Sequence, residues 1–208
     1  MTHEIVDKIR WLGHDGFSIK TDAATIVIDP FQLTEAVPAD ILLITHPHYD
    51  HCSPDDIDAV KKPSTVIVTE AESAQKLSGD VRVVKPGDTL EVKGVSIEAV
   101  PAYNIHKTFH PKAKNWLGFI VTIEGKRVYH AGDTDLIPEM DNLSVDVALL
   151  PVSGTYVMTA EEAVEAAKRL KPDIAIPMHY DAIVGSTQDA LQFNNALEGI
   201  CDVVVLTK

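Results

Sequence analysis

Short runs of β-branched and other apolar residues recur along the chain, many of them bounded by glycine, proline or aspartate. Such runs are shorter than ordinary helices and are rich in the residues that favour strands. They predict strands over 7–12, 17–20, 25–28, 41–45, 65–68, 81–84, 95–100, 119–123, 127–130, 145–150, 174–177 and 203–206. A chain with this pattern must fold around sheets.

The clearest predicted helix begins at a capping box. Thr159 and Glu162 have the spacing at which a hydroxyl and a carboxylate bond each other's free backbone N–H groups. We expect a helix over 160–170, which Pro172 prevents from continuing. Similar patterns predict further helices over 55–60, 71–77 and 187–197.

The order of the predicted elements suggests the architecture. Strands dominate the first half of the chain, and strands alternate with helices in the second half. This order predicts two sheets packed face to face with helices outside, a four-layer α/β sandwich. With 208 residues and no linker-like segment, we expect a single domain over residues 1–208.

Charge and composition narrow the classes of partner. Lys and Arg total 18 and Asp and Glu total 31, so the formal net charge is −13. This charge disfavours binding to nucleic acid or to an anionic membrane. The N-terminal sequence lacks a signal-peptide pattern, and only Cys52 and Cys201 are present, so we expect a cytoplasmic protein without disulfides that acts on a small molecule.

A dense group of titratable side chains follows one predicted strand. Residues 45–51 read THPHYDH, directly after the apolar run at 41–44. In extended chain, His46 and His48 point the same way and could bind one cation, while Asp50 and His51 could face a second position. A polar loop that happens to be rich in histidine is the alternative, but so many such groups in close proximity are costly without compensation.

Further candidate ligands follow other predicted strands. Asp133 comes just after the strand at 127–130, and His179 follows the strand at 174–177. Binding residues are often held in loops at strand ends. The polar stretch from Tyr103 to Trp116 is a long loop without periodicity, and such loops inside compact domains are often functional.

Three motifs carry a family resemblance. HPHYDH at 46–51, AGDTD at 131–135 and PMHY at 177–180 resemble the metallo-β-lactamase superfamily of binuclear metal hydrolases. WLGHDGFSI at 11–19 and IVIDP at 26–30 are similar to the opening of its small-hydrolase branch. That branch includes metal-dependent hydrolases of uncharacterised substrate, ascorbate-phosphate lactonases and N-acyl-phosphatidylethanolamine phospholipase D. The resemblance implies an αββα sandwich with a site at one edge of the two sheets.

The resemblance also implies a ligand set. His46 and His48 would bind a first metal, Asp50, His51 and His179 a second, and Asp133 both. The family's third imidazole on the first metal has no direct counterpart here, because residues 100–104 read VPAYN. His110 and His106 are both available, and the FHPK segment favours His110. His106 would then be a substrate-binding, supporting or surface residue.

Other residues near these motifs have less defined roles. Asp29 resembles a buried carboxylate that fixes a ligand imidazole, although it could simply close a turn. His14 could point at the site or stabilise its own turn. We expect His130 to be structural and Cys52 to pack beneath the loop rather than bind metal.

The implied chemistry is hydrolysis. Two divalent cations roughly 3.5–4 Å apart can share a hydroxide and polarise the bond that it attacks. Asp50 is the candidate catalytic residue that orients this hydroxide and accepts its proton. The mixed imidazole and carboxylate set suits Zn, and Mn or Fe fit nearly as well.

The expected substrate is a small ester, lactone or phosphodiester. Lys107, Lys112 and Lys114 suggest that the 103–116 loop docks an anionic group, with Lys112 as a candidate substrate-binding residue; the alternative is a solvated loop. A non-catalytic metal-binding or regulatory protein on the same fold, or an RNA-processing nuclease, are the alternative functions.

Overall fold

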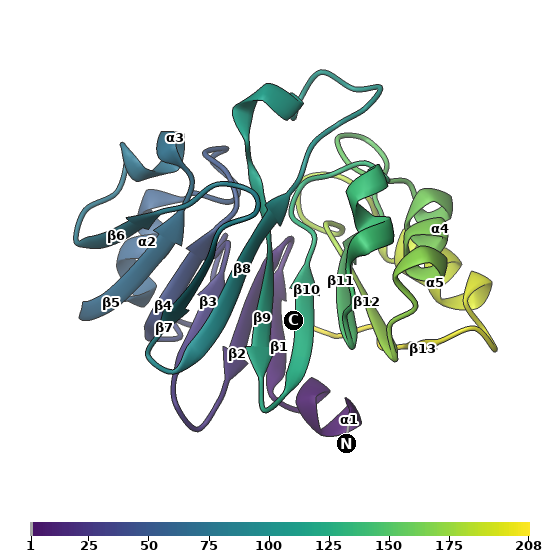
Figure 1. The fold of residues 1–208 in the computed structure, drawn as a ribbon. Coiled ribbons are helices and arrows are strands. Elements are labelled where there is room, and N and C mark those ends of the chain that lie inside the picture. The colour runs from purple at the N-terminus through teal and green to yellow at the C-terminus, as the bar shows by residue number, and fades with distance from the viewer. Residues whose placement is uncertain (1) are drawn as a thin grey trace.

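The computed structural model describes residues 2–208, which form two sheets packed face to face (Figure 1). The strands of the first sheet lie side by side in chain order: β1 (Ile9–Gly13), β2 (Gly16–Lys20), β3 (Thr25–Ile28), β4 (Ala39–Ile44), β5 (Lys61–Thr69) and β6 (Asp80–Val83). The second sheet has the reverse layout, β13-β12-β11-β10-β9-β8-β7. Its strands are β7 (Thr89–Val92), β8 (Val95–Pro101), β9 (Leu117–Ile123), β10 (Lys126–His130), β11 (Val147–Pro151), β12 (Ile174–Met178) and β13 (Asp202–Val203).

Each sheet begins antiparallel and ends parallel. Strands β1 to β3 and β7 to β10 pair antiparallel with their neighbours, whereas β3 to β6 and β10 to β13 pair in parallel. Parallel neighbours end at the same edge of a sheet, so the loops that follow them gather there.

Helices cover the outer faces of the sandwich. α2 (Pro54–Val60) and α3 (Ala71–Ala74) lie beside the first sheet, and α4 (Ala160–Leu170) and α5 (Thr187–Ala196) lie beside the second (Figure 1). The remaining helices are α1 (Thr2–Val6) and the 3₁₀ turns η1 (Lys112–Lys114) and η2 (Pro138–Asn142). The predicted αββα sandwich is confirmed.

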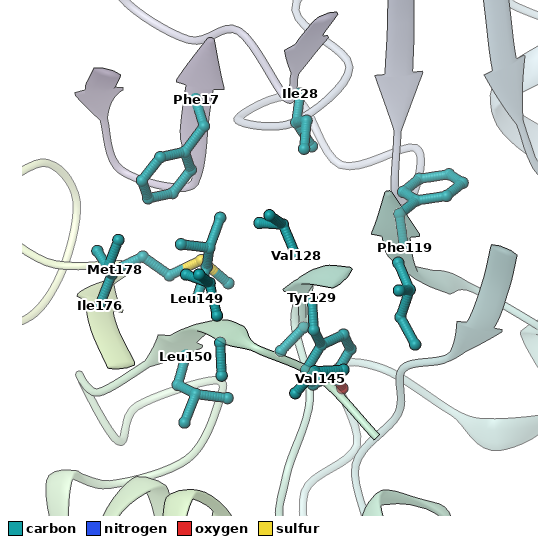
Figure 2. Packing of buried hydrophobic residues seen from close by; sticks show 14 of the residues in the cluster. Phe17, Ile28, Phe119, Val128, Tyr129, Val145, Leu149, Leu150, Ile176 and Met178 are labelled. Carbon is teal, nitrogen blue, oxygen red and sulfur yellow. The ribbon is translucent and has the colours of Figure 1, made fainter. Parts of the chain in front are cut away.

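The two-residue repeat of the strands sorts apolar side chains between layers. In β4, Ile41 and Leu43 join the large core, while Leu42 and Ile44 join the smaller cluster beneath α2. Figure 2 shows the same alternation in the second sheet: Val128 points toward Ile28 of the first sheet, and Tyr129 points away. A strand buried on both faces therefore reads as a continuous apolar run.

Several predicted boundaries were wrong. The strand expected over 203–206 is only Asp202–Val203, because beyond the bond from the Val204 amide to the Ala175 carbonyl the chain leaves the sheet edge. The helix expected over 71–77 ends at Ala74 and continues in 3₁₀-type bonds. β7 and α1 were not predicted. No helix of the described residues is long and apolar enough to cross a membrane.

Candidate metal centre

The candidate ligands meet at the edge where the parallel strands end. His46 follows β4, Asp133 follows β10 and His179 follows β12. His110 arrives from the loop between β8 and β9. Residues from both sheets, more than a hundred positions apart in the chain, thus converge in one place.

The first cluster consists of imidazoles. Ligand atoms of His46, His48 and His110 lie within 4.8 Å of one another, and His46 Nε2 is 2.9 Å from His48 Nδ1. The Nδ1 atoms of His46 and His110 have hydrogen-bond partners: Thr45 Oγ1 is 3.0 Å from His46 Nδ1, and Asn104 Oδ1 is 3.1 Å from His110 Nδ1. Such contacts fix the orientation of a ring and leave its other nitrogen free to bind a metal.

The second cluster mixes imidazoles with a carboxylate. Ligand atoms of Asp50, His51 and His179 lie within 4.8 Å of one another, together with one of His14. Each of the three has a supporting partner: His14 Nε2 is 3.0 Å from Asp50 Oδ2, Asp29 Oδ2 is 2.8 Å from His51 Nδ1, and Ser153 Oγ is 2.8 Å from His179 Nδ1. Asp29 also accepts a hydrogen bond from the Thr45 amide, so it ties the two clusters together.

Asp133 lies between the two clusters. Its carboxylate oxygens are 3.1 Å from His110 Nε2, 3.4 Å from His51 Nε2, 3.4 Å from His179 Nε2 and 3.9 Å from His46 Nε2. Gly132, with φ +63°, makes the turn that places it there. One carboxylate oxygen can therefore serve each cluster.

Four buried atoms of the predicted ligand residues have no hydrogen-bond partner among the described residues. They are Nε2 of His51, His110 and His179 and Oδ1 of Asp133. Buried polar atoms are normally paired, because an unpaired one loses its hydration without compensation. Their convergence, with an imidazole and carboxylate donor set, fits divalent cations.

The electrostatics of the cluster call for positive charge. Burial lowers the pKa of His51 and His179, but the neighbouring carboxylates together outweigh it. Asp133 and Asp29 raise the pKa of His51 well above 6.5, and Asp133 and Asp15 raise that of His179 to about 9. Burial raises the pKa of Asp50, but the hydrogen bond with His14 and the charge of His51 outweigh it and lower the value to about 2. The Asp50 and Asp133 carboxylates thus stay ionised and attract cationic partners, a role that metal ions can fill.

Sequence reasoning missed Asp15, Asn104 and Ser153. Asp15 is fully buried, and a carboxyl oxygen lies within 4.8 Å of ligand atoms of Asp133 and His179. Neither of its carboxyl oxygens has a hydrogen-bond partner within residues 2–208. Burial raises its pKa well above the usual value, and the nearby Asp133 carboxylate adds to this shift. Its position beside His14 in GHDGF was the available signal.

The two other candidate residues of the 103–116 loop lie apart from these ligands. His106 is exposed, and its backbone N–H lies 3.4 Å from Asp135 Oδ2. Lys112 is exposed and pairs with Glu139 at 2.8 Å. A substrate-binding role for either remains a prediction, and these contacts add no support to it.

The secondary residues have defined places. His14 points at the site and contacts Asp50, while Asp29 supports His51, as described above. His130 is buried, with Nε2 2.9 Å from the Asp15 carbonyl oxygen, a structural contact. Cys52 packs in the apolar cluster beneath α2, where burial raises the pKa of its thiol to about 11.

Comparison with known proteins points to the same chemistry. The model of the beta-lactamase superfamily domain matches residues 8–179. A UPF0173 metal-dependent hydrolase from Thermoplasma volcanium is 37% identical over 216 residues, covering 97% of this chain and 96% of the relative. A second, from Methanopyrus kandleri, is 32% identical and covers 96% of each chain.

Solved structures share the architecture. A crystal structure from Parabacteroides distasonis is 37% identical and superposes with a TM-score of 0.86, covering 96% of this chain and 93% of that one. A metallo hydrolase from Ignicoccus hospitalis is 27% identical with a TM-score of 0.78, covering 95% and 94%. The similarity extends over nearly the full length in each case.

Proposed function

This chain belongs to the metallo-β-lactamase superfamily, and from that premise we propose that it is a binuclear metal-dependent hydrolase of small esters, lactones or phosphodiesters. That it is a metal-dependent hydrolase follows from relatives of that description that match nearly its whole length. The observation that carries the binuclear proposal is the position of Asp133 between two clusters, which leave Nε2 of His110 in the first and Nε2 of His51 and His179 in the second buried and unpaired among the described residues.

Each cluster supplies a set of ligands for one cation. His46, His48 and His110 would hold the first, and Asp50, His51 and His179 the second, with Asp133 shared. Bound divalent cations would supply an ionised water and would polarise the scissile bond. Zinc is the ion that this donor set suits first, with manganese or iron as alternatives.

The chain's own residues provide orientation and proton transfer. Asp50 lies at the wall of a cavity beside the ligands, where a carboxylate can orient an attacking water and accept its proton. His14 holds one Asp50 oxygen at 3.0 Å and so restricts its rotation. The pKa of Asp50, about 2, keeps its carboxylate ionised at neutral pH, so it can accept a hydrogen bond from a water.

Metal counting on matched variants tests the ligand assignment. The purified protein would be stripped with a chelator, reloaded separately with zinc, manganese or iron, and analysed for metal per chain. We expect two ions per chain in the parent protein and in His106→Ala, and about one in His110→Ala. Loss of an ion from His106→Ala, with two retained in His110→Ala, would reverse the assignment.

Turnover tests the function itself. The reloaded protein would be screened against bis-p-nitrophenyl phosphate, a lactone panel and p-nitrophenyl acyl esters, with Asp50→Asn as the matched inactive variant. We expect hydrolysis of at least one class, reduced about 10²–10⁴-fold in the variant, the range for loss of a general base. Two ions per chain with no turnover of any class would instead favour a non-catalytic binding protein.

A further inference from the structure

A cavity of about 270 Å³ opens directly beside the candidate ligands. Its polar side is formed by His48, Asp50, His110 and Asp133, and its other side by Tyr49, Phe109, Tyr156 and Ile183. A bond placed near the cations would therefore have its substituents in contact with aromatic and aliphatic side chains.

These four apolar side chains come from four different loops. Tyr49 follows β4, Phe109 precedes η1, Tyr156 lies between β11 and α4, and Ile183 lies between β12 and α5. Phe109 contacts Tyr156 edge-on, with ring centroids 4.6 Å apart. The four loops thus each contribute one side chain to a common apolar wall.

The wall is exposed to solvent. Tyr49 is 66% exposed, Phe109 48% and Ile183 38%, unusual values for large apolar side chains. Apolar surface gathered around a polar centre is typical of ligand-binding sites, because a bound ligand removes that surface from water.

None of the described residues that line the cavity is a lysine or an arginine. The lysines of the neighbouring loop are paired elsewhere: Lys107 with Asp135 at 2.6 Å, Lys112 with Glu139 at 2.8 Å and Lys114 with Glu72 at 2.7 Å. An anionic substituent would find no lysine or arginine counterion in this cavity and would approach a protein of net charge −13. The Asp50 and Asp133 carboxylates on the polar side of the cavity are candidate metal ligands.

We infer that the substrate carries an uncharged apolar substituent, aromatic or branched aliphatic, that packs against Tyr49, Phe109, Tyr156 and Ile183. This inference rests on the proposed function for the position of the reacting bond. It replaces the expectation of an anionic group docked by the lysines of the 103–116 loop.

Binding of two matched phosphonates tests the inference without depending on turnover. Benzylphosphonate and 4-carboxybenzylphosphonate share a head group that can bind the cations and differ by one carboxylate on the ring. We expect calorimetry on the metal-loaded protein to give a Kd roughly tenfold lower for benzylphosphonate, a ratio typical of discrimination by an apolar pocket. Equal affinities, tighter binding of the carboxylated compound, or no binding of either would overturn the inference.

Two variants that each add one lysine test whether the difference in affinity between the two phosphonates arises at the apolar wall. Phe109→Lys should abolish or reverse the preference, because it places a counterion on the wall. Ile200→Lys makes the same change at a side chain that is 53% exposed and does not line the cavity, so it should keep the parent ratio. Equal changes in both variants would indicate a general charge effect and contradict the inference.

A third variant guards against a folding defect. Phe109→Ala should weaken benzylphosphonate binding several-fold and leave the carboxylated compound unchanged, with an unaltered Tm and metal content. Failure to hydrolyse any ester, lactone or phosphodiester would count against the proposed function alone, since the binding ratio is measured independently.

Discussion

Asn104 is the residue that decides how His110 is presented to the site. Its side-chain oxygen is 3.1 Å from His110 Nδ1 and accepts the His110 backbone N–H at 2.9 Å. Its amide group donates to Asp135 and to the Tyr156 carbonyl, so it is itself fixed. In the proposed metal site, this support would let an imidazole on a long loop take the place of one directly after a strand.

Removing that support should weaken metal binding without removing a ligand. We expect Asn104→Ala to lower the affinity of one cation about 10–100-fold, the usual effect of losing a group that orients a ligand. Competition with a chromophoric chelator measures it, and Asn195→Ala on the exposed side of α5 is the matched control. An unchanged affinity in a folded Asn104→Ala protein would show that His110 needs no orientation, or is no ligand.

Asp15 is a buried carboxyl group without a donor among the described residues. Such a group is tolerated when it is neutral or when a cation lies beside it. Because Asp15 lies close to Asp133 and His179, we favour the explanation that a cation lies beside it. We expect Asp15→Asn to bind the second cation at least tenfold more weakly while the first remains, as in loss of a supporting group. Metal analysis at graded free-metal concentrations would measure this loss.

The exposed Asp22→Asn provides the control for that experiment. If Asp15→Asn binds both cations with parent affinity and is more stable than the parent, Asp15 is only a buried acid, and the cation explanation fails.

At the scale of elements, the sequence predicted most strands because their residues carry their own signal. Runs such as 41–44 are apolar on both faces, and the Thr159–Glu162 capping box is observed, with both of its hydrogen bonds. β7 escaped prediction because its sequence, TLEV, contains no continuous apolar run and it gains its order from pairing with β8. The 103–116 loop is ordered by contacts with Asp135 and Glu139, which no local pattern reveals.

The candidate ligand motifs HPHYDH and AGDTD could also be recognised from local sequence, because each directly follows a predicted strand. Of the supporting residues, Asp29 was named from the sequence, whereas Asn104 and Ser153 were missed. They are common loop residues whose partners lie 6 and 26 positions away. Their role depends on the loops converging, which is a property of the tertiary structure.

The turn after β10 requires glycine at position 132. A Cβ there would lie 2.5 Å from the Leu117 carbonyl oxygen, and φ is +63°. We expect Gly132→Ala to cost about 3 kcal/mol or more and to displace Asp133, because it combines a backbone clash with a left-handed conformation. Thermal unfolding and metal content would both report the change.

Gly125 offers a matched control in the β9–β10 hairpin. Its φ is +78°, but a Cβ there would meet nothing within 4 Å. Gly125→Ala should therefore cost only about 1 kcal/mol, the conformational part, and keep both cations. Equal costs at the two positions would show that the contact with Leu117 is unimportant.

At the scale of the whole molecule, the candidate ligands join the two sheets. His46 and His51 belong to the end of β4 in the first sheet, whereas Asp133 and His179 follow strands of the second. The cations would bind this arrangement only when both sheets are folded and packed together. Binding to the folded state alone stabilises it by about 2.7 kcal/mol when the free metal is 100 times its Kd.

Chelation should therefore lower the stability of the entire sandwich rather than of one loop. For a chain of this size we expect the Tm to fall by about 5–10 °C for each cation removed, since about 1 kcal/mol corresponds to 2–4 °C. Scanning calorimetry with and without a chelator measures the shift, and re-addition of zinc should restore it. Asp133→Asn, which lacks the shared carboxylate, should respond much less to either treatment. A Tm that is independent of metal in the parent protein, with two ions demonstrably bound, would mean that the unfolded chain retains them, because only then does binding fail to favour the fold.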